Sequence, residues 1–142
     1  MIVVDTNVLI YAIDKDSTRH EGAKAWLEKT LSGNEVIGLA WVVVLAFLRL
    51  TTKVGIAAQP LSIEAALEVV KEWLDHPGVS ILHPGPQHVH ILCTLLLKTG
   101  AGGNLTTDAH LAALAIEHGA QLCSFDHDFA RFPGLEWSAP SD

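Results

Sequence analysis

The chain has 142 residues, of which 49% are hydrophobic, and this length and composition suit a single folded domain over residues 1–142. Its formal net charge of −7, with only nine Lys and Arg, argues against a protein that coats nucleic acid nonspecifically. No export signal or membrane-length apolar run is present, and two cysteines suit reduced thiols, so we expect a cytoplasmic protein without membrane association.

Short apolar runs bounded by Gly, Pro and polar residues alternate between strand-like and helix-like patterns along the chain. In chain order, they predict a strand over 1–5, a helix over 8–13, a helix from 18 to 33, a strand over 36–39, a helix over 41–52, a helix between 60 and 76, a strand over 79–82, a helix over 89–98, a helix over 108–118 and a strand over 122–125. Strands that alternate with helices indicate an α/β layer with a parallel sheet.

Local signals refine several of these boundaries. Thr18 and Glu21 have the spacing of a capping box, which predicts that a helix begins there. Thr107 is expected to cap the helix that follows it. Residues 41–52 are apolar on nearly every side, which predicts a buried helix. Residues 100–103 are expected to form a flexible loop, with no Lys-Ser/Thr context for a phosphate cradle.

Four aspartates stand at positions that a parallel sheet brings together. Asp5 ends the first strand, Asp126 and Asp128 follow the last strand, and Asp108 lies in the first turn of an apolar helix. The carboxyl ends of parallel strands line one crevice, and a helix N-terminus favours an anion. We therefore expect these carboxylates to converge although they are distant in sequence.

Converging carboxylates repel one another, and a hard divalent cation such as Mg²⁺ or Mn²⁺ relieves that repulsion. Such an ion can activate water and polarise a phosphoryl oxygen, which is the chemistry of a nuclease or phosphatase. Each acid also has a simpler interpretation: Asp5 as a helix cap, Asp108 as a first-turn residue, and Asp126 and Asp128 as turn formers. Their joint placement favours the metal site.

Other polar residues fit such a site less well. Glu117 lies nine positions after Asp108 and is expected on the opposite face of that helix. The segment HPGPQHVH contains His83, His88 and His90, but no Cys or acid completes a zinc site there. Arg49 has two open interpretations: a snorkelling surface residue, or a supporting contact that binds RNA phosphate or neutralises the acids of the site. The four tryptophans are expected in the core or in a dimer contact.

Three stretches of the sequence follow the pattern of a known family. In chain order they read VVDTNVLIYAID, GNLTTDAHLAALAIEHGA and SFDHDFARFPGL. They resemble the PIN domain, and specifically the VapC-type toxins of bacterial toxin–antitoxin pairs. The resemblance implies an α/β fold, a three-layer sandwich with a central parallel sheet flanked by helices. It also implies a Mg²⁺- or Mn²⁺-dependent endoribonuclease that cleaves structured RNA, tRNA or ribosomal RNA.

The resemblance also assigns roles and partners. It implies that Asp5, Asp108 and Asp126 bind the metal and that Asp128 is a further catalytic acid, with Thr6 and Asn7 as the small polar residues that follow the first acid. The expected partners are an RNA substrate, a VapB-type antitoxin and a second copy of the chain in a homodimer.

One position departs from the family pattern. Most members carry a Glu in the apolar helix at the position of Ala46, so one metal-site carboxylate is missing. This Ala is either natural or a substitution that disarms the protein, and it supports the alternative of a catalytically silent module that binds antitoxin or RNA. An aspartyl phosphatase is disfavoured because Asn7 stands where a second Asp is needed, and a phospho-accepting signalling domain lacks its early acid pair.

Overall fold

The computed structural model describes residues 1–100 and 102–140. Within them, the strands form one parallel sheet in the order β3-β2-β1-β4-β5. The strands are β1 (Ile2–Val4), β2 (Ile37–Ala40), β3 (Val79–Leu82), β4 (Gln121–Cys123) and β5 (Trp137–Ser138). The strand β1 lies in the centre, and Val3 pairs with Gly38 on one side and with Leu122 on the other.

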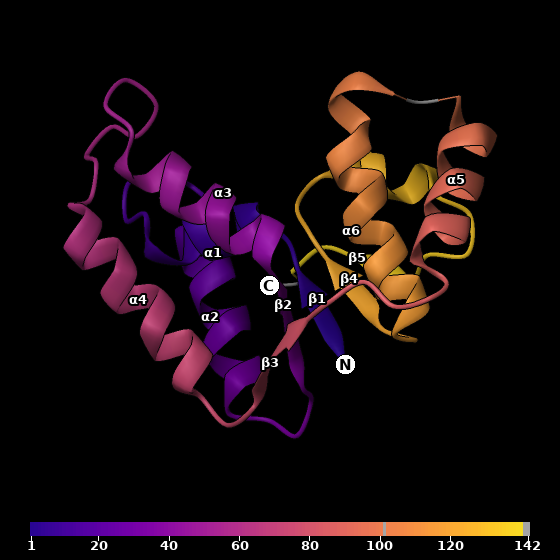
Figure 1. Ribbon diagram of the computed structural model, residues 1–142. Helices are drawn as coiled ribbons and strands as arrows, with labels where there is room; N and C mark the ends of the chain where they lie inside the picture. The colour runs from indigo at the N-terminus through magenta and orange to yellow at the C-terminus, as the bar shows by residue number, and fades with distance from the viewer. Residues whose placement is uncertain (101, 141–142) are drawn as a thin grey trace.

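Helices cover both faces of this sheet. The α-helices are α1 (Thr6–Ile13), α2 (His20–Leu31), α3 (Trp41–Thr52), α4 (Ile63–Asp75), α5 (His88–Thr99) and α6 (Thr106–Glu117). Figure 1 shows α1 to α4 on one side of the sheet and α5 and α6 on the other. The predicted three-layer α/β sandwich with a central parallel sheet is therefore confirmed. No helix within the described ranges is long and apolar enough to cross a membrane.

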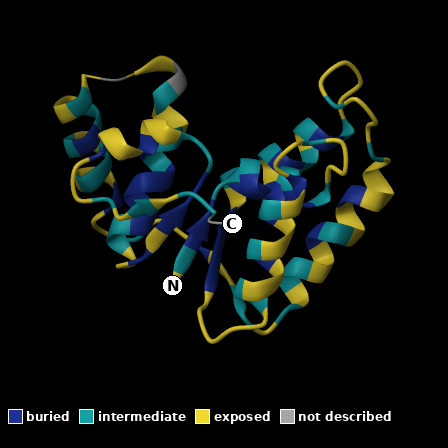
Figure 2. Cartoon of the chain, turned by 180° about the vertical axis from the view of Figure 1, so that it is seen from behind, coloured by how far each residue is buried: buried dark blue, intermediate teal, exposed yellow. Residues whose placement is uncertain are grey.

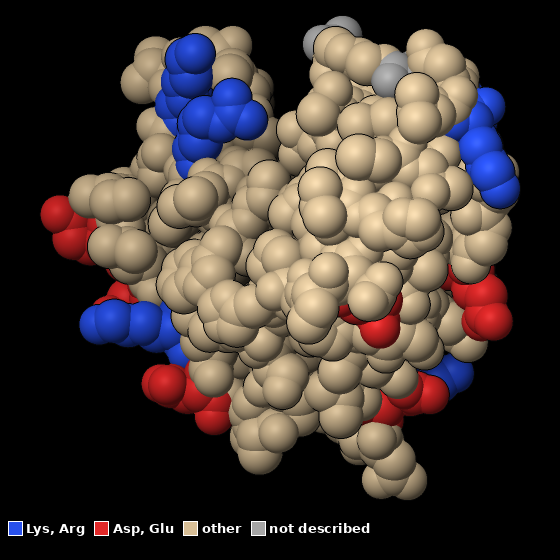
Figure 3. Space-filling view, turned by 45° about the vertical axis from the view of Figure 1, so that its right-hand side comes forward, with Lys and Arg blue, Asp and Glu red and all other residues tan. Residues whose placement is uncertain are grey.

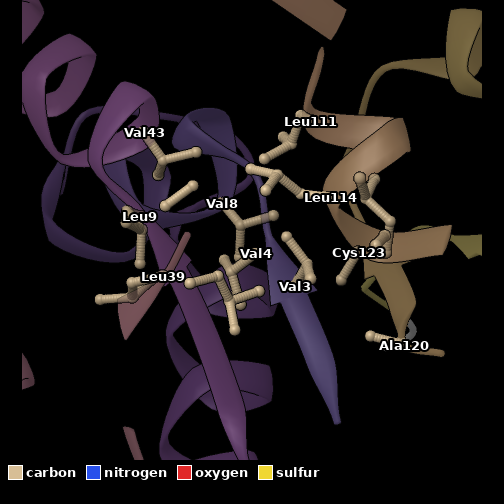
Figure 4. Close-up of a cluster of buried hydrophobic side chains, with 14 of the residues drawn as sticks. Val3, Val4, Val8, Leu9, Leu39, Val43, Leu111, Leu114, Ala120 and Cys123 are labelled. Atoms are coloured by element: carbon tan, nitrogen blue, oxygen red, sulfur yellow. The ribbon is translucent and has the colours of Figure 1, made fainter. Parts of the chain in front are cut away.

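The core lies on both faces of the central strands. Val3 and Val4 are fully buried, as β-branched residues of a central parallel strand are expected to be. Figure 4 shows the side chains of Leu9 and Leu39 on one side of β1 and those of Leu111 and Leu114 on the other. Figure 2 shows that buried residues concentrate in the sheet and on the inward faces of the helices. This buried apolar layer fixes the strand ends from which the acids project.

The helix α2 does not begin with the predicted capping box. Its N-cap is Arg19, which makes no side-chain capping bond, so the expectation for Thr18 and Glu21 was wrong. The backbone N–H of Arg19 donates instead to Ser17 Oγ, at 3.1 Å. The ring nitrogen Nδ1 of His20 lies 2.9 Å from the carbonyl oxygen of Tyr11. The start of α2 is therefore set by its attachment to α1.

The cap predicted for α6 was also wrong. The helix begins at Thr106 rather than after Thr107, and its N-cap, Leu105, makes no side-chain capping bond. A 3₁₀ turn, η1 (Gly103–Leu105), leads directly into it, so Gly103 does not lie in a loop. Gly100 ends α5 with a φ of +62°, a conformation that favours glycine. The remaining part of the predicted loop includes Ala101, which lies outside the described residues.

The helix α3 has the predicted boundaries but is not buried all round. Val43 and Phe47 face the core, whereas Trp41 is 46% exposed and Leu45 is 60% exposed on the outer side. Spacing of four residues puts Trp41, Leu45 and Arg49 on one outward stripe, because α3 packs against neighbours on one side only. The other three tryptophans, Trp26, Trp73 and Trp137, pack partly buried against the core.

The end of the chain adds structure that the sequence did not predict. The strand β4 is shorter than the predicted 122–125, and it is followed by a 3₁₀ turn, η2 (His127–Arg131), and by β5. The strand β5 has only two residues and carries no apolar run. It joins the edge of the sheet through the pairs Leu122–Trp137 and Cys123–Ser138. Both cysteines are free thiols, with Cys93 exposed and Cys123 buried.

Candidate active site

Asp5 is the residue that joins β1 to α1. Its carboxylate caps the helix, because Oδ1 accepts from the Thr6 N–H at 2.7 Å. The other oxygen, Oδ2, accepts from Ser124 Oγ at 2.6 Å. Burial raises the pKa of the Asp5 carboxyl, and the hydrogen bonds from Ser124 and Thr6 counteract part of that rise. Asp5 therefore both caps α1 and takes part in a polar site.

Asn7 and Ser124 tie the loop after β4 to the start of α1. The amide Nδ2 of Asn7 lies 3.3 Å from Asp5 Oδ2 and 3.1 Å from Ser124 Oγ. Its Oδ1 accepts from the Phe125 N–H at 3.1 Å. Ser124 is fully buried, and sequence reasoning missed it. One feature of the sequence could have identified Ser124: it stands between a buried strand and an acid. A buried hydroxyl group there needs a hydrogen-bond partner inside the fold.

Asp126 and Asp128 occupy the turn that follows. The Asp126 N–H donates to Ser124 Oγ at 3.0 Å, and Asp126 Oδ1 accepts from the Asp128 N–H at 2.9 Å. Asp126 therefore caps η2, as the turn-forming interpretation predicts, and is half-buried, whereas Asp128 is exposed. The indole N–H of Trp137 donates to the Ser124 carbonyl at 3.1 Å. The strand β5, which carries Trp137, thus holds this turn from the outer side.

Asp108 lies in the first turn of α6, where the helix dipole favours a negative charge. Its pKa is nevertheless raised to about 6, first by burial and then by the negative charges of Asp5, Asp126 and Asp128. These charges act on Asp108 from two other segments of the chain. The structure therefore brings the other three predicted acids within electrostatic reach of Asp108.

The four acids fit a divalent cation in their chemistry. Carboxylate oxygens are the hard ligands that Mg²⁺ and Mn²⁺ prefer, and the repulsion that raises the Asp108 pKa is what a cation offsets. In residues 1–100 and 102–140, however, no three His, Cys, Asp or Glu side chains are grouped so that they could hold a metal ion. Donor type and charge thus support the site, and the metal-ligand roles of Asp5, Asp108 and Asp126 stay predictions.

The supporting residues differ in how closely they approach the acids. Thr6 Oγ1 lies 3.5 Å from the Val43 carbonyl, which places the first turn of α1 beside α3. Ala46 follows Val43 by three residues on α3 and is half-buried. Arg49 is exposed and forms no ion pair with the described residues. Both interpretations of Arg49 therefore stay open.

Glu117 has a structural task away from the four acids. Its carboxylate accepts from the backbone N–H groups of Gly85 at 2.7 Å and of Gln87 at 2.8 Å. These bonds lower the pKa of the Glu117 carboxyl, with a further contribution from His88 and His118. A Cβ at Gly85 would lie 2.6 Å from Glu117 Oε2, so a larger residue there would displace this carboxylate from its hydrogen bonds. Glu117 holds the segment that leads into α5.

The histidines of HPGPQHVH serve the packing of the same region. His88 Nε2 lies 2.9 Å from Nδ1 of His110 on α6, and the two rings meet edge to face. The carbonyl oxygen of His83 lies 3.0 Å from His118 Nε2, while His90 is exposed. The three histidines thus make separate contacts rather than facing a common centre.

The sequence profile of the PIN domain matches residues 2–135. This chain belongs to the PIN-domain family. It is 47% identical to Ribonuclease VapC37 of Mycobacterium tuberculosis strain H37Rv, over 99% of this chain and 97% of that protein. It is 42% identical to Ribonuclease VapC33 of the same strain, over 99% of this chain and 98% of that protein. Within the PIN domains, it therefore groups with the VapC ribonucleases.

Solved structures share this PIN fold. The structure of VapBC2 from Rickettsia felis bound to a DNA fragment from its promoter matches with a TM-score of 0.74 and 21% identity, over 99% of this chain and 100% of that chain. The structure of VapC20 from Mycobacterium tuberculosis, a toxin that cleaves the sarcin–ricin loop, matches with a TM-score of 0.70 and 20% identity, over 96% of this chain and 99% of that chain. At these identities, the likeness establishes the fold.

Proposed function

We propose that this VapC-type PIN domain is a divalent-metal-dependent endoribonuclease toxin that hydrolyses phosphodiester bonds in structured RNA, either tRNA or ribosomal RNA. The proposal is carried by the placement of four carboxylates from three segments of the chain within electrostatic reach of Asp108, where burial first and then the charges of the other three acids raise its pKa to about 6. Membership of the VapC ribonucleases supports the reaction class.

The proposed division of labour follows from the contacts. Asp5, Asp108 and Asp126 would hold Mg²⁺ or Mn²⁺, which when bound supplies an acidic water and polarises a phosphoryl oxygen. Ser124 and Thr6 fix the Asp5 carboxylate through bonds of 2.6 and 2.7 Å and counteract part of the rise that burial causes in its pKa. Asp128 is exposed beside Asp126 and is proposed as a further catalytic acid. The Asp108 carboxyl, whose pKa is near neutrality, can hold a proton part of the time.

The proposed partners follow from the same family. We infer a VapB-type antitoxin that blocks the acids with a basic side chain, because four repelling carboxylates attract a cation. The solved relatives include a VapBC complex from Haemophilus influenzae and a toxin–antitoxin complex from Klebsiella pneumoniae. A homodimer is proposed as well, and sedimentation at micromolar concentration tests it: a monomer there would contradict the dimer.

The test of the reaction uses the purified chain and total RNA, with Mg²⁺, with Mn²⁺ and with chelator. Discrete fragments that form only with metal are the expected result. Asp5→Asn and Asp108→Asn should each lower cleavage by about 100-fold or more, because each removes a charge from the proposed metal site. Asp75→Asn is the matched control, since Asp75 is exposed at the end of α4. Equal cleavage by Asp108→Asn and the control would refute the assignment.

Ala46 favours a second candidate function, a catalytically silent PIN module that binds RNA or antitoxin. The position lacks the carboxylate that most of the family carries, so the proposed site has one acid fewer. Both candidates predict RNA or antitoxin binding, but only the ribonuclease predicts fragments that require metal. An RNA pattern unchanged by metal, together with retained RNA binding, would favour the silent module.

A further inference from the structure

One residue along the chain from Asp126 begins a group of three residues that none of the proposed roles uses. The guanidinium carbon Cζ of Arg19 stands 4.8 Å from the ring centroid of Phe125 and 5.9 Å from that of Tyr11. The two rings lie 5.4 Å apart at an angle of 60°. We call Tyr11, Arg19 and Phe125 the arginine–aromatic cluster.

The cluster is continuous with the acids through the backbone and through α1. Phe125 stands between Ser124 and Asp126, and its N–H donates to Asn7 Oδ1 at 3.1 Å. Tyr11 follows Asn7 by four residues on α1, so the two side chains share one face of that helix. Through Phe125, the cluster therefore adjoins Asp126 along the chain, and through Asn7 it is linked to the residues that hold Asp5.

Arg19 is held in place while its charge stays available. Its backbone N–H donates to Ser17 Oγ at 3.1 Å, and the neighbouring His20 is anchored on the Tyr11 carbonyl at 2.9 Å. The side chain is exposed and, among the described residues, forms no ion pair. As the N-cap of α2, it makes no capping bond, and a cation is unfavourable at a helix N-terminus. The arginine therefore contributes little to α2 itself.

The chemistry of the cluster selects an anion with planar geometry. Aromatic faces attract a guanidinium and fix its plane, which leaves the N–H groups at its edge free to bind phosphate with two bonds. Basic residues are scarce in a chain of net charge −7, and on the face drawn in Figure 3 they form small separate groups rather than a continuous patch. A single arginine whose plane is fixed then binds a phosphate more effectively than basic residues scattered over the surface.

We propose that Arg19, oriented by Phe125 and Tyr11, binds a backbone phosphate of the RNA substrate next to the bond that the acids act on. This inference rests on the proposed ribonuclease function and adds a substrate-binding residue to it. Arg19 does not touch the acids, so it acts on substrate binding and not on the reacting atoms. The predicted signature is a higher KM with a kcat within about twofold of the parent.

The test measures binding of labelled bulk tRNA to the full chain in chelator over a series of salt concentrations. Arg19→Ala should weaken binding about fivefold or more and reduce the slope of log affinity against log salt by about one phosphate contact. Arg19→Lys should keep the slope and lose part of the affinity, because lysine keeps the charge without the planar fork. Phe125→Leu should weaken binding less than Arg19→Ala while the fold stays intact.

Lys29→Ala is the matched control, because Lys29 is exposed in the last turn of the same helix, α2. Equal weakening by Arg19→Ala and Lys29→Ala would overturn the inference while the ribonuclease proposal stands. A parent chain that neither binds nor cleaves RNA would overturn both proposals. Polyglutamate binding that Arg19→Ala abolishes, with RNA binding unchanged, would assign the cluster to an acidic protein partner instead.

Discussion

Asp5 and Asp108 act on each other electrostatically, yet the chain stabilises them in different ways. Asp5 is held at the junction of β1 and α1 by Ser124, Thr6 and Asn7, so its burial is offset by hydrogen bonds. The Asp108 carboxylate accepts no hydrogen bond from the described residues, and the other acids repel it. The Asp5 carboxylate thus has hydrogen-bond partners that offset its burial, whereas the Asp108 carboxylate is destabilised by the negative charges of the other acids.

This difference predicts opposite responses to mutation. On the Asp5 side, removal of a partner leaves a buried carboxylate with fewer hydrogen bonds, which destabilises the fold. On the Asp108 side, removal of the charge relieves repulsion, which stabilises the fold in the absence of metal. Catalysis is expected to fall on both sides, so the sign of the change in stability, and not the activity, distinguishes the Asp5 side from the Asp108 side.

The largest effect on stability is expected at Ser124. Ser124→Ala removes the 2.6 Å bond to Asp5 and the acceptor for the Asp126 N–H. The free energy of unfolding should fall by about 1–3 kcal/mol, measured by urea titration at pH 7.5. Ser80→Ala, at an exposed position of β3, is the control. Equal effects of the two variants would contradict the role of Ser124 as the partner that holds Asp5.

A smaller effect of opposite sign is expected at Asp108. In chelator at pH 7.5, Asp108→Asn should raise the Tm by about 2 °C or more, because it removes one of four repelling charges. Thermal unfolding of Asp75→Asn measures the effect of losing an exposed carboxylate elsewhere. If the Tm of Asp108→Asn is lower than that of the parent protein and lower than that of Asp75→Asn, the four acids do not repel one another.

The raised pKa of Asp108 also predicts a pH dependence. Its folded pKa of about 6 exceeds the usual aspartate value of 3.8, so the folded state binds more protons between these values. The free energy of unfolding should therefore gain a contribution from Asp108 as pH falls from about 7 to 4, and lose it as pH rises through 6. Asp5, whose pKa is raised by burial, adds to the same trend.

Urea titrations from pH 4 to 8 in chelator check this, with Asp108→Asn as the comparison. The difference in stability between the parent and Asp108→Asn should grow in favour of the variant as pH rises through 6. A constant difference over that range would show that Asp108 titrates like an exposed acid.

The fold and the approach of the other acids to Asp108 could be predicted from the sequence because the signals are local and strong, whereas the roles of these acids stay predictions. A run such as Ile2–Val4 has few alternatives to a buried strand, and the acids follow directly from where such strands end. Ser124 was missed because its importance depends on Asn7 and Asp5, which lie 117 and 119 residues away. The short strand β5 was missed because it has two residues and is formed by tertiary pairing rather than by its own pattern.

The helix caps failed for a related reason. Thr18 and Thr107 have the composition of caps, but α2 begins where His20 meets the Tyr11 carbonyl and α6 continues from the turn at Gly103–Leu105. Contacts between elements thus overrode the local preference at both helix starts.

The smallest change in stability is expected from Ala46→Glu, which tests whether position 46 belongs to the site. Ala46 is half-buried on α3, one turn after Val43, whose carbonyl lies 3.5 Å from Thr6 Oγ1. If position 46 faces the acids, Ala46→Glu adds a fifth negative charge and a possible cation ligand there. In chelator it should lower the Tm slightly, and with Mn²⁺ it should tighten metal binding and raise cleavage.

Leu45→Glu is the matched control. Leu45 is 60% exposed on the outer stripe of α3, so the substitution adds the same negative charge away from the core. Calorimetric titration with Mn²⁺ and cleavage of total RNA measure both variants. Tighter Mn²⁺ binding by Ala46→Glu alone would mean that Ala46 disarms the site. Unchanged binding and cleavage in Ala46→Glu, with a severe loss in Asp128→Asn, would mean that Asp128 already supplies the missing carboxylate. If neither Ala46→Glu nor Asp128→Asn changes Mn²⁺ binding or RNA cleavage, position 46 lies outside the site. The electrostatic repulsion then involves only Asp108 and the acids whose charges act on it.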